Sequence, residues 1–213
     1  MFRPFLTIKS MLAVSFFSLM FSHLILASSL TDLQRDWALA NYVSAESEQD
    51  VKFESLIAQA ELAIAEDPNN AELFIWQGII LSTAAGKAGG LSALGLIKDA
   101  KASLEHAIEI DASALNGSAY TSLGALYYQV PGWPIAFGSD KKARKFLEKS
   151  LTINPDGIDP NFFYGEFLIR KKDYKAAAQA LNRALSAAPR AGREIADEGR
   201  RKEIIKLLAK INS

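Results

Sequence analysis

Few side chains in this sequence have the types and spacing that catalysis or metal binding requires. The chain has no cysteine, which excludes disulfides, thiol nucleophiles and thiolate metal sites. Its two histidines are His23 and His106, and the first falls in an N-terminal segment that we expect to be removed, which excludes a histidine-rich metal site. Gly86-Lys87 lacks the upstream glycine and the following Ser or Thr of a phosphate-binding loop. Asp156 and Asp159 lie in a loop, where we expect them to cap helices. The sequence therefore predicts no catalytic residue, no metal site and no cofactor.

A second group of side chains has the chemistry of a binding surface. Aromatic and charged residues recur in two stretches, 120–129 and 161–170, where helical spacing would place several of them on one face. The candidate contact residues are Tyr128, Trp133, Phe162, Glu166 and Arg170. Further positions predicted on this face are Glu72, Ile75, Ile79, Thr121 and Ala125. The alternative is that Tyr128 and Phe162 are core residues, and that Glu166 and Arg170 form a surface ion pair four residues apart.

These residues must be positioned by helices, and the helices follow a repeat. In each of three copies a glycine lies four residues after the start of the pattern and three before its end, as in Tyr120-x2-Leu123-Gly124-x2-Tyr127. An alanine then follows, with a leucine four residues later. The repeat positions are Gly78 with Ala100, Gly124 with Ala143, and Gly165 with Ala177. Pro155 and Pro189, which close the last two copies, are 34 residues apart. We expect each glycine to let the second helix of a pair approach the first, with the alanine opposite leaving room.

Two insertions interrupt this pattern between the helices of a pair. The glycine and alanine are 12 residues apart in the last copy, but 19 apart in the middle copy and 22 apart in the first. The first insertion, residues 83–95, is rich in small residues and predicts either a crossover or an extended second helix. The second, residues 130–138, contains two prolines, so the preceding helix must end near Gln129, and Ser139 or Asp140 should cap the next. Trp133 and Phe137 in this loop either fold over a repeat seam or face a ligand.

The two ends of the chain differ from the repeats. Residues 1–27 read as a secretory signal peptide, because Arg3 and Lys9 precede an apolar run that ends at Ala27; the alternative is an uncleaved membrane anchor. Residues 28–70 predict a degenerate first helix pair, with helices that we expect to start at Thr31 and near Val51, separated by a polar run at 44–50. Residues 71–189 hold the three repeats. Residues 190–213 predict a charged capping helix over the last repeat.

The charged residues of the capping helix predict a solvated surface. The pairs four residues apart are Arg193/Asp197, Asp197/Arg201 and Glu198/Lys202, and Arg200-Arg201-Lys202 is expected to face water. Over the whole chain, Lys+Arg and Asp+Glu both number 24, so there is no net positive charge to attract nucleic acid.

From residues 74 to 189 the sequence resembles tetratricopeptide repeat proteins. More narrowly, the stretch YYQVPGWPIAFGSDKKARKFLEKSLTINP and the ADEGRRKEI tail resemble small exported bacterial members of that group, and the PGWP insertion is similar to the T-component proteins of TRAP-type transporters. The resemblance implies an all-α, right-handed superhelix of antiparallel helix pairs whose first helices line a concave groove. The signal peptide and the lack of catalytic groups predict a non-catalytic periplasmic scaffold that binds a protein segment or a small ligand in this groove, and the balanced charge predicts no nucleic acid. The alternative functions are an accessory protein of a TRAP-type transporter and an enzyme. The alternative location is the inner membrane, as an anchored form, and a further possible partner is a second copy of the chain in a homo-oligomer.

Overall fold

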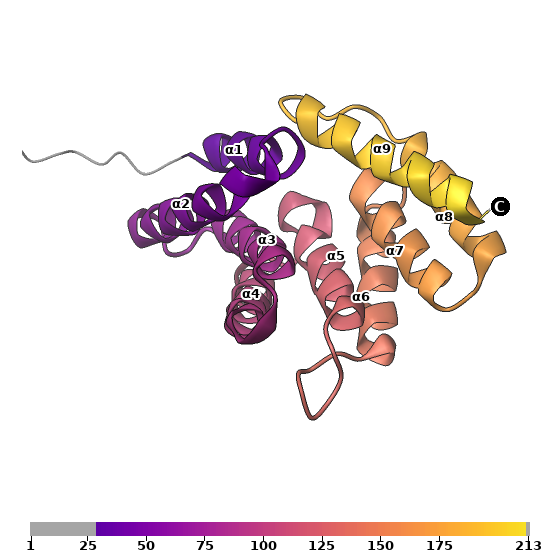
Figure 1. The fold of residues 1–213 in the computed structure, drawn as a ribbon, viewed down its shortest axis with the longest axis horizontal. Helices are drawn as coiled ribbons and strands as arrows, with labels where there is room; N and C mark the ends of the chain where they lie inside the picture. The colour runs from indigo at the N-terminus through magenta and orange to yellow at the C-terminus, as the bar shows by residue number, and fades with distance from the viewer. Residues whose placement is uncertain (1–28, 212–213) are drawn as a thin grey trace, which may run out of the picture.

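The computed structural model describes residues 29–211, and in this part of the chain every regular element is an α-helix. The helices are α1 (Leu30–Tyr42), α2 (Glu46–Glu66), α3 (Ala71–Ala88), α4 (Gly90–Ile110), α5 (Ala114–Gln129), α6 (Asp140–Ile153), α7 (Ile158–Arg170), α8 (Tyr174–Leu185) and α9 (Glu194–Ile211). Consecutive helices pack as hairpins that stack side by side into an arch (Figure 1). The all-α fold class is confirmed, and the signal-peptide prediction lies outside the described residues.

The three repeats are helix pairs that cross at their glycines. A Cβ added at Gly78 would lie 2.5 Å from Leu104 Cγ, one at Gly124 would lie 2.6 Å from Leu147 Cγ, and one at Gly165 would lie 2.8 Å from Leu181 Cγ. Each of these leucines follows by four residues an alanine that is fully buried, namely Ala100, Ala143 and Ala177. The glycine therefore makes room for a leucine of the partner helix, and the same crossing is repeated in all three pairs.

The two insertions have different structures. The first lengthens both helices of its pair: α3 continues to Ala88, and the chain reverses at Gly89 and Gly90, whose φ values of 64° and 62° favour glycine. The second forms a loop between α5 and α6, closed by a hydrogen bond from the Gly138 amide to the Pro131 carbonyl (2.8 Å). Helix α5 ends at Gln129, and the Ser139 hydroxyl accepts a hydrogen bond from the Lys142 amide, so both predictions about this loop are confirmed.

The predicted starts of the first two helices were wrong. Helix α1 is capped by Ser29 rather than Thr31, because Ser29 and Asp32 form a reciprocal capping box. Helix α2 begins at Glu46, five residues before Val51. Its first turn carries Glu46 and Glu48, which the positive end of the helix dipole favours, so the polar run 44–50 is helical from Glu46 onward and the break is confined to residues 43–45.

The last helix does more than cap the final repeat. Helix α9 packs against α8 and α7, and it also reaches back to α1 at the other end of the chain (Figure 1). Gly199 permits this contact: a Cβ there would lie 2.4 Å from Tyr42 Cδ1. The arch is therefore closed on one side by its first and last helices.

Most of the charged side chains of α9 that were predicted to face water are instead buried or paired within the protein. Asp197 is 5% exposed and pairs with Arg190 (2.6 Å), not with Arg193 or Arg201. The Arg201 guanidinium donates to the Ala187 carbonyl (2.9 Å). Only the predicted Glu198–Lys202 pair forms on the surface, at 2.7 Å. Helix α9 buries the side that packs on α1, α7 and α8, and it exposes many residues of its other side.

Within residues 29–211, no helix combines the length and the hydropathy that crossing a membrane requires.

Candidate binding chamber

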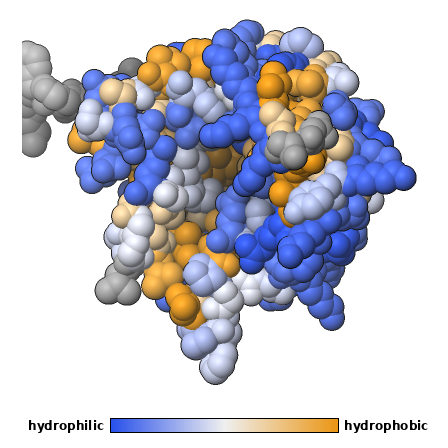
Figure 2. Space-filling model, turned by 45° about the vertical axis from the view of Figure 1, so that its right-hand side comes forward, coloured by the Kyte–Doolittle hydropathy of each residue, from blue (hydrophilic) through white to orange (hydrophobic). Residues whose placement is uncertain are grey.

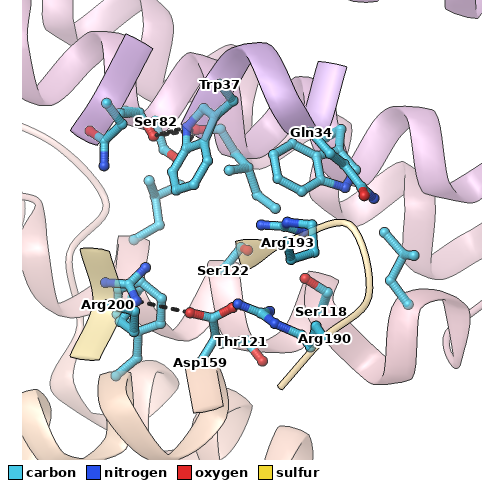
Figure 3. A pocket seen from close by; sticks show the side chains of 18 of the residues that line it. Gln34, Trp37, Ser82, Ser118, Thr121, Ser122, Asp159, Arg190, Arg193 and Arg200 are labelled. Atoms are coloured by element: carbon cyan, nitrogen blue, oxygen red, sulfur yellow. Dashed lines mark hydrogen bonds and ion pairs between the residues drawn. The ribbon is translucent and has the colours of Figure 1, made fainter. Parts of the chain in front are cut away.

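A cavity of about 430 Å³ lies on the concave side of the arch, beneath α1 and α9. We call it the binding chamber. Figure 2 shows the molecule hollowed between its N-terminal and C-terminal helices, and Figure 3 shows the cavity from close by. Its lining includes Gln34, Trp37 and Tyr42 of α1; Trp76, Ile79 and Thr83 of α3; Asn116, Ser118, Thr121, Ser122 and Ala125 of α5; Asp159 and Phe163 of α7; Arg190 from the loop before α9; and Arg193 near its start with Arg200 and Glu203 of α9.

A network of ion pairs centred on Asp159 fixes one wall of the chamber. Asp159 Oδ2 accepts from Arg190 Nη1 at 2.7 Å, and Asp159 Oδ1 accepts from Arg200 Nε at 2.9 Å. Arg190 also pairs with Asp197 at 2.6 Å, and Arg200 pairs with Glu203 at 2.7 Å. Burial alone would raise the pKa of Asp159, but Arg200 and Arg190 outweigh it and lower that pKa to about 2. Because these charges satisfy one another, they hold α7, α9 and the loop before α9 in fixed positions.

Two further contacts join this wall to its neighbours. The Arg200 guanidinium stacks over the rings of Phe162 and Phe163, with centroid distances of 4.1 and 4.8 Å. The Tyr42 hydroxyl of α1 donates to Glu203 Oε2 at 3.4 Å. Burial raises the pKa of Tyr42 to about 12, and burial also raises the pKa of Glu203. The junction between α1 and α9 therefore joins a half-buried tyrosine to a partly exposed glutamate.

The floor of the chamber includes a backbone segment in an unusual conformation. Leu115, Asn116 and Gly117 at the start of α5 have φ values of 47°, 55° and 72°, all in the left-handed region. For the two non-glycine residues this conformation costs ~1–3 kcal/mol each, and such costs are concentrated at functional sites. The kink directs the chain so that Leu115 and Asn116 line the chamber.

The opposite wall is aromatic. The Trp37 indole N–H donates to Thr83 Oγ1 at 3.0 Å, and its ring meets Trp76 edge-on with a centroid distance of 5.6 Å. The Arg193 guanidinium lies over the Trp76 ring at 4.7 Å. In Figure 3, Arg193 lies between the Trp37 side of the chamber and the Asp159–Arg190 pair. The chamber thus offers aromatic faces on one side and charged groups on the other.

The structure does not bring the five predicted contact residues into this chamber. Tyr128 is 4% exposed and its hydroxyl donates to Glu166 Oε2, so α5 and α7 bury both groups where they pack. Phe162 is 5% exposed beneath Arg200. Arg170 lies on the surface and pairs with Asp140 at 3.5 Å, not with Glu166. Tyr128 and Phe162 are therefore packing residues, as the alternative held.

The two aromatic residues of the loop between α5 and α6 have different environments. Trp133 is 89% exposed, on the loop that protrudes between α5 and α6 (Figure 1). Phe137 folds back and meets the Tyr127 ring edge-on, with a centroid distance of 5.3 Å. The loop therefore packs through Phe137 and presents Trp133 to solvent.

Sequence reasoning found part of the chamber and missed its most polar part. Ile79, Thr121 and Ala125, which were predicted to face the groove, do line it. Asp159, Arg190, Arg193 and Arg200 were interpreted as capping or surface residues. One signal was present: Arg193 and Arg200 are seven residues apart, two helical turns, so they share a face of α9.

The acidic side chains of the chamber are few and paired. Among the described residues, no cluster of three or more His, Asp or Glu side chains could hold a metal ion. Its acids Asp159 and Glu203 are both paired with Arg200.

Comparison with known proteins agrees with this architecture. The family model "Tetratricopeptide repeat" matches residues 137–211. A solved structure, "Crystal structure of MamA", aligns over 80% of this chain and 94% of that one, with 20% sequence identity and a TM-score of 0.46. No curated protein in the comparison matches the chain. Residues 137–211 thus match the tetratricopeptide repeat model, and the stacked helix pairs with their repeated glycine–leucine crossings have the predicted tetratricopeptide-like architecture.

Proposed function

We propose that this protein is a non-catalytic scaffold that holds a segment of a partner protein in the binding chamber. The observation that carries the proposal is the chamber itself: a cavity on the concave face, bounded by helices from both ends of the chain. Tetratricopeptide repeat proteins generally act as interaction scaffolds, which supports a protein partner and disfavours the enzyme alternative.

The size of the chamber limits what it can accept. Ligand cavities commonly measure ~300–1,000 Å³, and this one, at about 430 Å³, is at the small end. Helices α1 and α9 cover the side on which an open groove would continue. A few side chains or the end of a segment would fit, whereas a long helix laid along the arch would not.

We also propose that the protein works in the periplasm, because residues 1–27 have the pattern of a secretory signal. The test is fractionation of cells that express the chain with a C-terminal tag, followed by mass measurement. The mature protein should lack residues 1–27 and appear in the periplasmic fraction. A full-length chain in the membrane fraction would favour the anchored form instead. An accessory role in TRAP-type transport stays a prediction that no comparison tests.

Partner binding is tested by crosslinking and affinity purification of the tagged protein, with a variant that fills the chamber. Ser122 lines the cavity, and its side chain makes no hydrogen bond within the described residues. Ser122→Trp should therefore occupy the space without breaking a side-chain hydrogen bond. Ser47→Trp is the matched control, since Ser47 is exposed on α2. The crosslinked partner should be lost from Ser122→Trp and kept by Ser47→Trp. Equal recovery with both variants, each still folded by circular dichroism, would place the partner elsewhere.

A further inference from the structure

We propose that the chamber recognises a single carboxylate group, bound by the Arg193 guanidinium, on a ligand whose body lies against the aromatic wall. The inference rests on the proposed function, because it names the chemistry that the same chamber accepts.

The first observation is that Arg193 differs from the two arginines beside it. Arg190 and Arg200 are each held by two carboxylates. Within residues 29–211, no carboxylate lies within ion-pair distance of Arg193, and its buried Nε has no acceptor. Burial and the like charge of Arg190 lower the pKa of Arg193. An anion in the chamber would pair with the terminal guanidinium nitrogens of Arg193, which have no partner in the described residues, and would offset both effects.

The second observation is an unpartnered donor next to Arg193. Trp76 is 2% exposed and its Nε1 has no hydrogen-bond acceptor in the described part of the chain, although the neighbouring Trp37 donates to Thr83. A buried donor without an acceptor costs ~1–3 kcal/mol, and native proteins keep few of them. Arg193 and Trp76 both line the cavity and their side chains stack, so these two unpartnered donors lie within its wall, and the terminal nitrogens of Arg193 are the groups left for a ligand oxygen.

The charge balance of the chamber selects among anions. Arg190, Arg193 and Arg200 are opposed by Asp159, Glu203 and Asp197, so three cations meet three anions. Only one of the cations is unpaired. A dianion such as phosphate would add two negative charges beside Asp159, whereas a carboxylate adds one and matches the planar guanidinium.

The remaining lining indicates what carries that carboxylate. Gln34, Ser118 and Ser122 line the cavity, and their side chains make no hydrogen bond within the described residues. Trp37 and Trp76 supply apolar faces beside them. A ligand with one carboxylate, a hydrogen-bonding amide and an aromatic or apolar side chain would use each of these groups. Both a peptide C-terminus and a free N-acylated amino acid have this chemistry.

The test is isothermal titration calorimetry on the mature chain with four probes. They are N-acetylphenylalanine, its carboxamide, a pentapeptide that ends in phenylalanine with a free carboxylate, and inorganic phosphate. At least one carboxylate probe should bind saturably with one site per chain, while the carboxamide and phosphate bind at least about tenfold more weakly. If the pentapeptide binds more tightly than N-acetylphenylalanine, the carboxylate belongs to a partner's C-terminus; the reverse order points to a free small acid.

Two variants assign the site. Arg193→Gln should weaken carboxylate binding roughly 10- to 100-fold, the range for hydrogen bonds to a charged group. Arg183→Gln is the matched control, because Arg183 is exposed on α8. This variant should bind the probes as the unmodified chain does. Arg193→Lys, which keeps the charge, should restore part of the affinity, so a loss caused only by altered folding can be recognised.

The inference is overturned if neither carboxylate probe binds saturably, if acid and carboxamide bind equally, or if Arg193→Gln binds as tightly as Arg183→Gln. Its failure is distinct from that of the proposed function. A partner whose crosslinking depends on Ser122, together with no carboxylate binding, would leave the scaffold role standing and remove only the ligand assignment.

Discussion

Replacing Asp159 with asparagine should destabilise the protein, because this carboxylate joins α7 to both Arg190 and Arg200. The size of the loss follows from its pKa, which is lowered from 3.8 to about 2. Each pKa unit corresponds to ~1.4 kcal/mol, so the charged form contributes about 2 kcal/mol to folding. Asparagine keeps the shape and removes the charge, and it leaves Arg200 short of a partner in a buried site. Breaking such pairs costs up to ~3–5 kcal/mol, so we expect a loss of about 2–4 kcal/mol.

The assay is urea unfolding of the unmodified chain and of Asp159→Asn at a series of pH values. A carboxyl group with a lowered folded-state pKa stabilises the protein fully above its unfolded pKa, and this contribution is lost as the pH falls through the folded pKa. The difference between the two proteins should therefore be constant above about pH 4, shrink as the pH falls, and approach zero near pH 2. At neutral pH the melting temperature should fall by roughly 5–15 °C.

Asp156→Asn is the matched control, since Asp156 is exposed in the loop before α7 and lies three residues from Asp159. It should change the free energy of unfolding by less than ~0.5 kcal/mol. If Asp159→Asn were equally mild, or if its effect did not change with pH, the ion-pair network would not be what fixes α9.

Three further substitutions test the packing. Phe162→Ala should lower the free energy of unfolding by ~3–5 kcal/mol, measured by urea denaturation, because the ring is buried beneath Arg200; a change below ~1 kcal/mol would contradict its core position. Gly124→Ala should cost ~1–3 kcal/mol in the same assay, because its Cβ would meet Leu147 at 2.6 Å, whereas Gly86→Ala in open space should be neutral or stabilising. Trp133→Ala should leave the melting temperature within ~1–2 °C, because the side chain is 89% exposed; a larger fall would mean that the loop packs on the body.

The repeat architecture could be predicted because it depends on the spacing of residues that are close together in the sequence. A glycine on one helix and a leucine four residues after an alanine on the next recur three times, and each copy makes the same crossing in the structure. The bounds of the second loop were predicted correctly from its prolines and from Ser139, because these residues act on the backbone within a few positions.

The chamber could not be predicted in the same way, because it depends on contacts between distant parts of the chain. Arg200 meets Asp159 across 41 residues, and Tyr42 meets Glu203 across 161. Without the return of α9 to α1, Arg193 and Arg200 look like ordinary surface charges on a helix. Tyr128 was misplaced for a related reason: helical spacing gives the face on which it lies but not which helix covers that face.

The most direct test of the closed chamber is a disulfide between α1 and α9. A Cβ at Gly199 would lie 2.5 Å from Tyr42 Cγ, which is one bond from Tyr42 Cβ. The two Cβ atoms are then within ~4 Å, as disulfides require. The chain has no cysteine, so Tyr42→Cys with Gly199→Cys gives an unambiguous pair. Mild oxidation should link the two thiols within one chain nearly completely, as judged by mass and by loss of free thiol. Two thiols that stay reactive in the folded protein would show that α9 does not close onto α1.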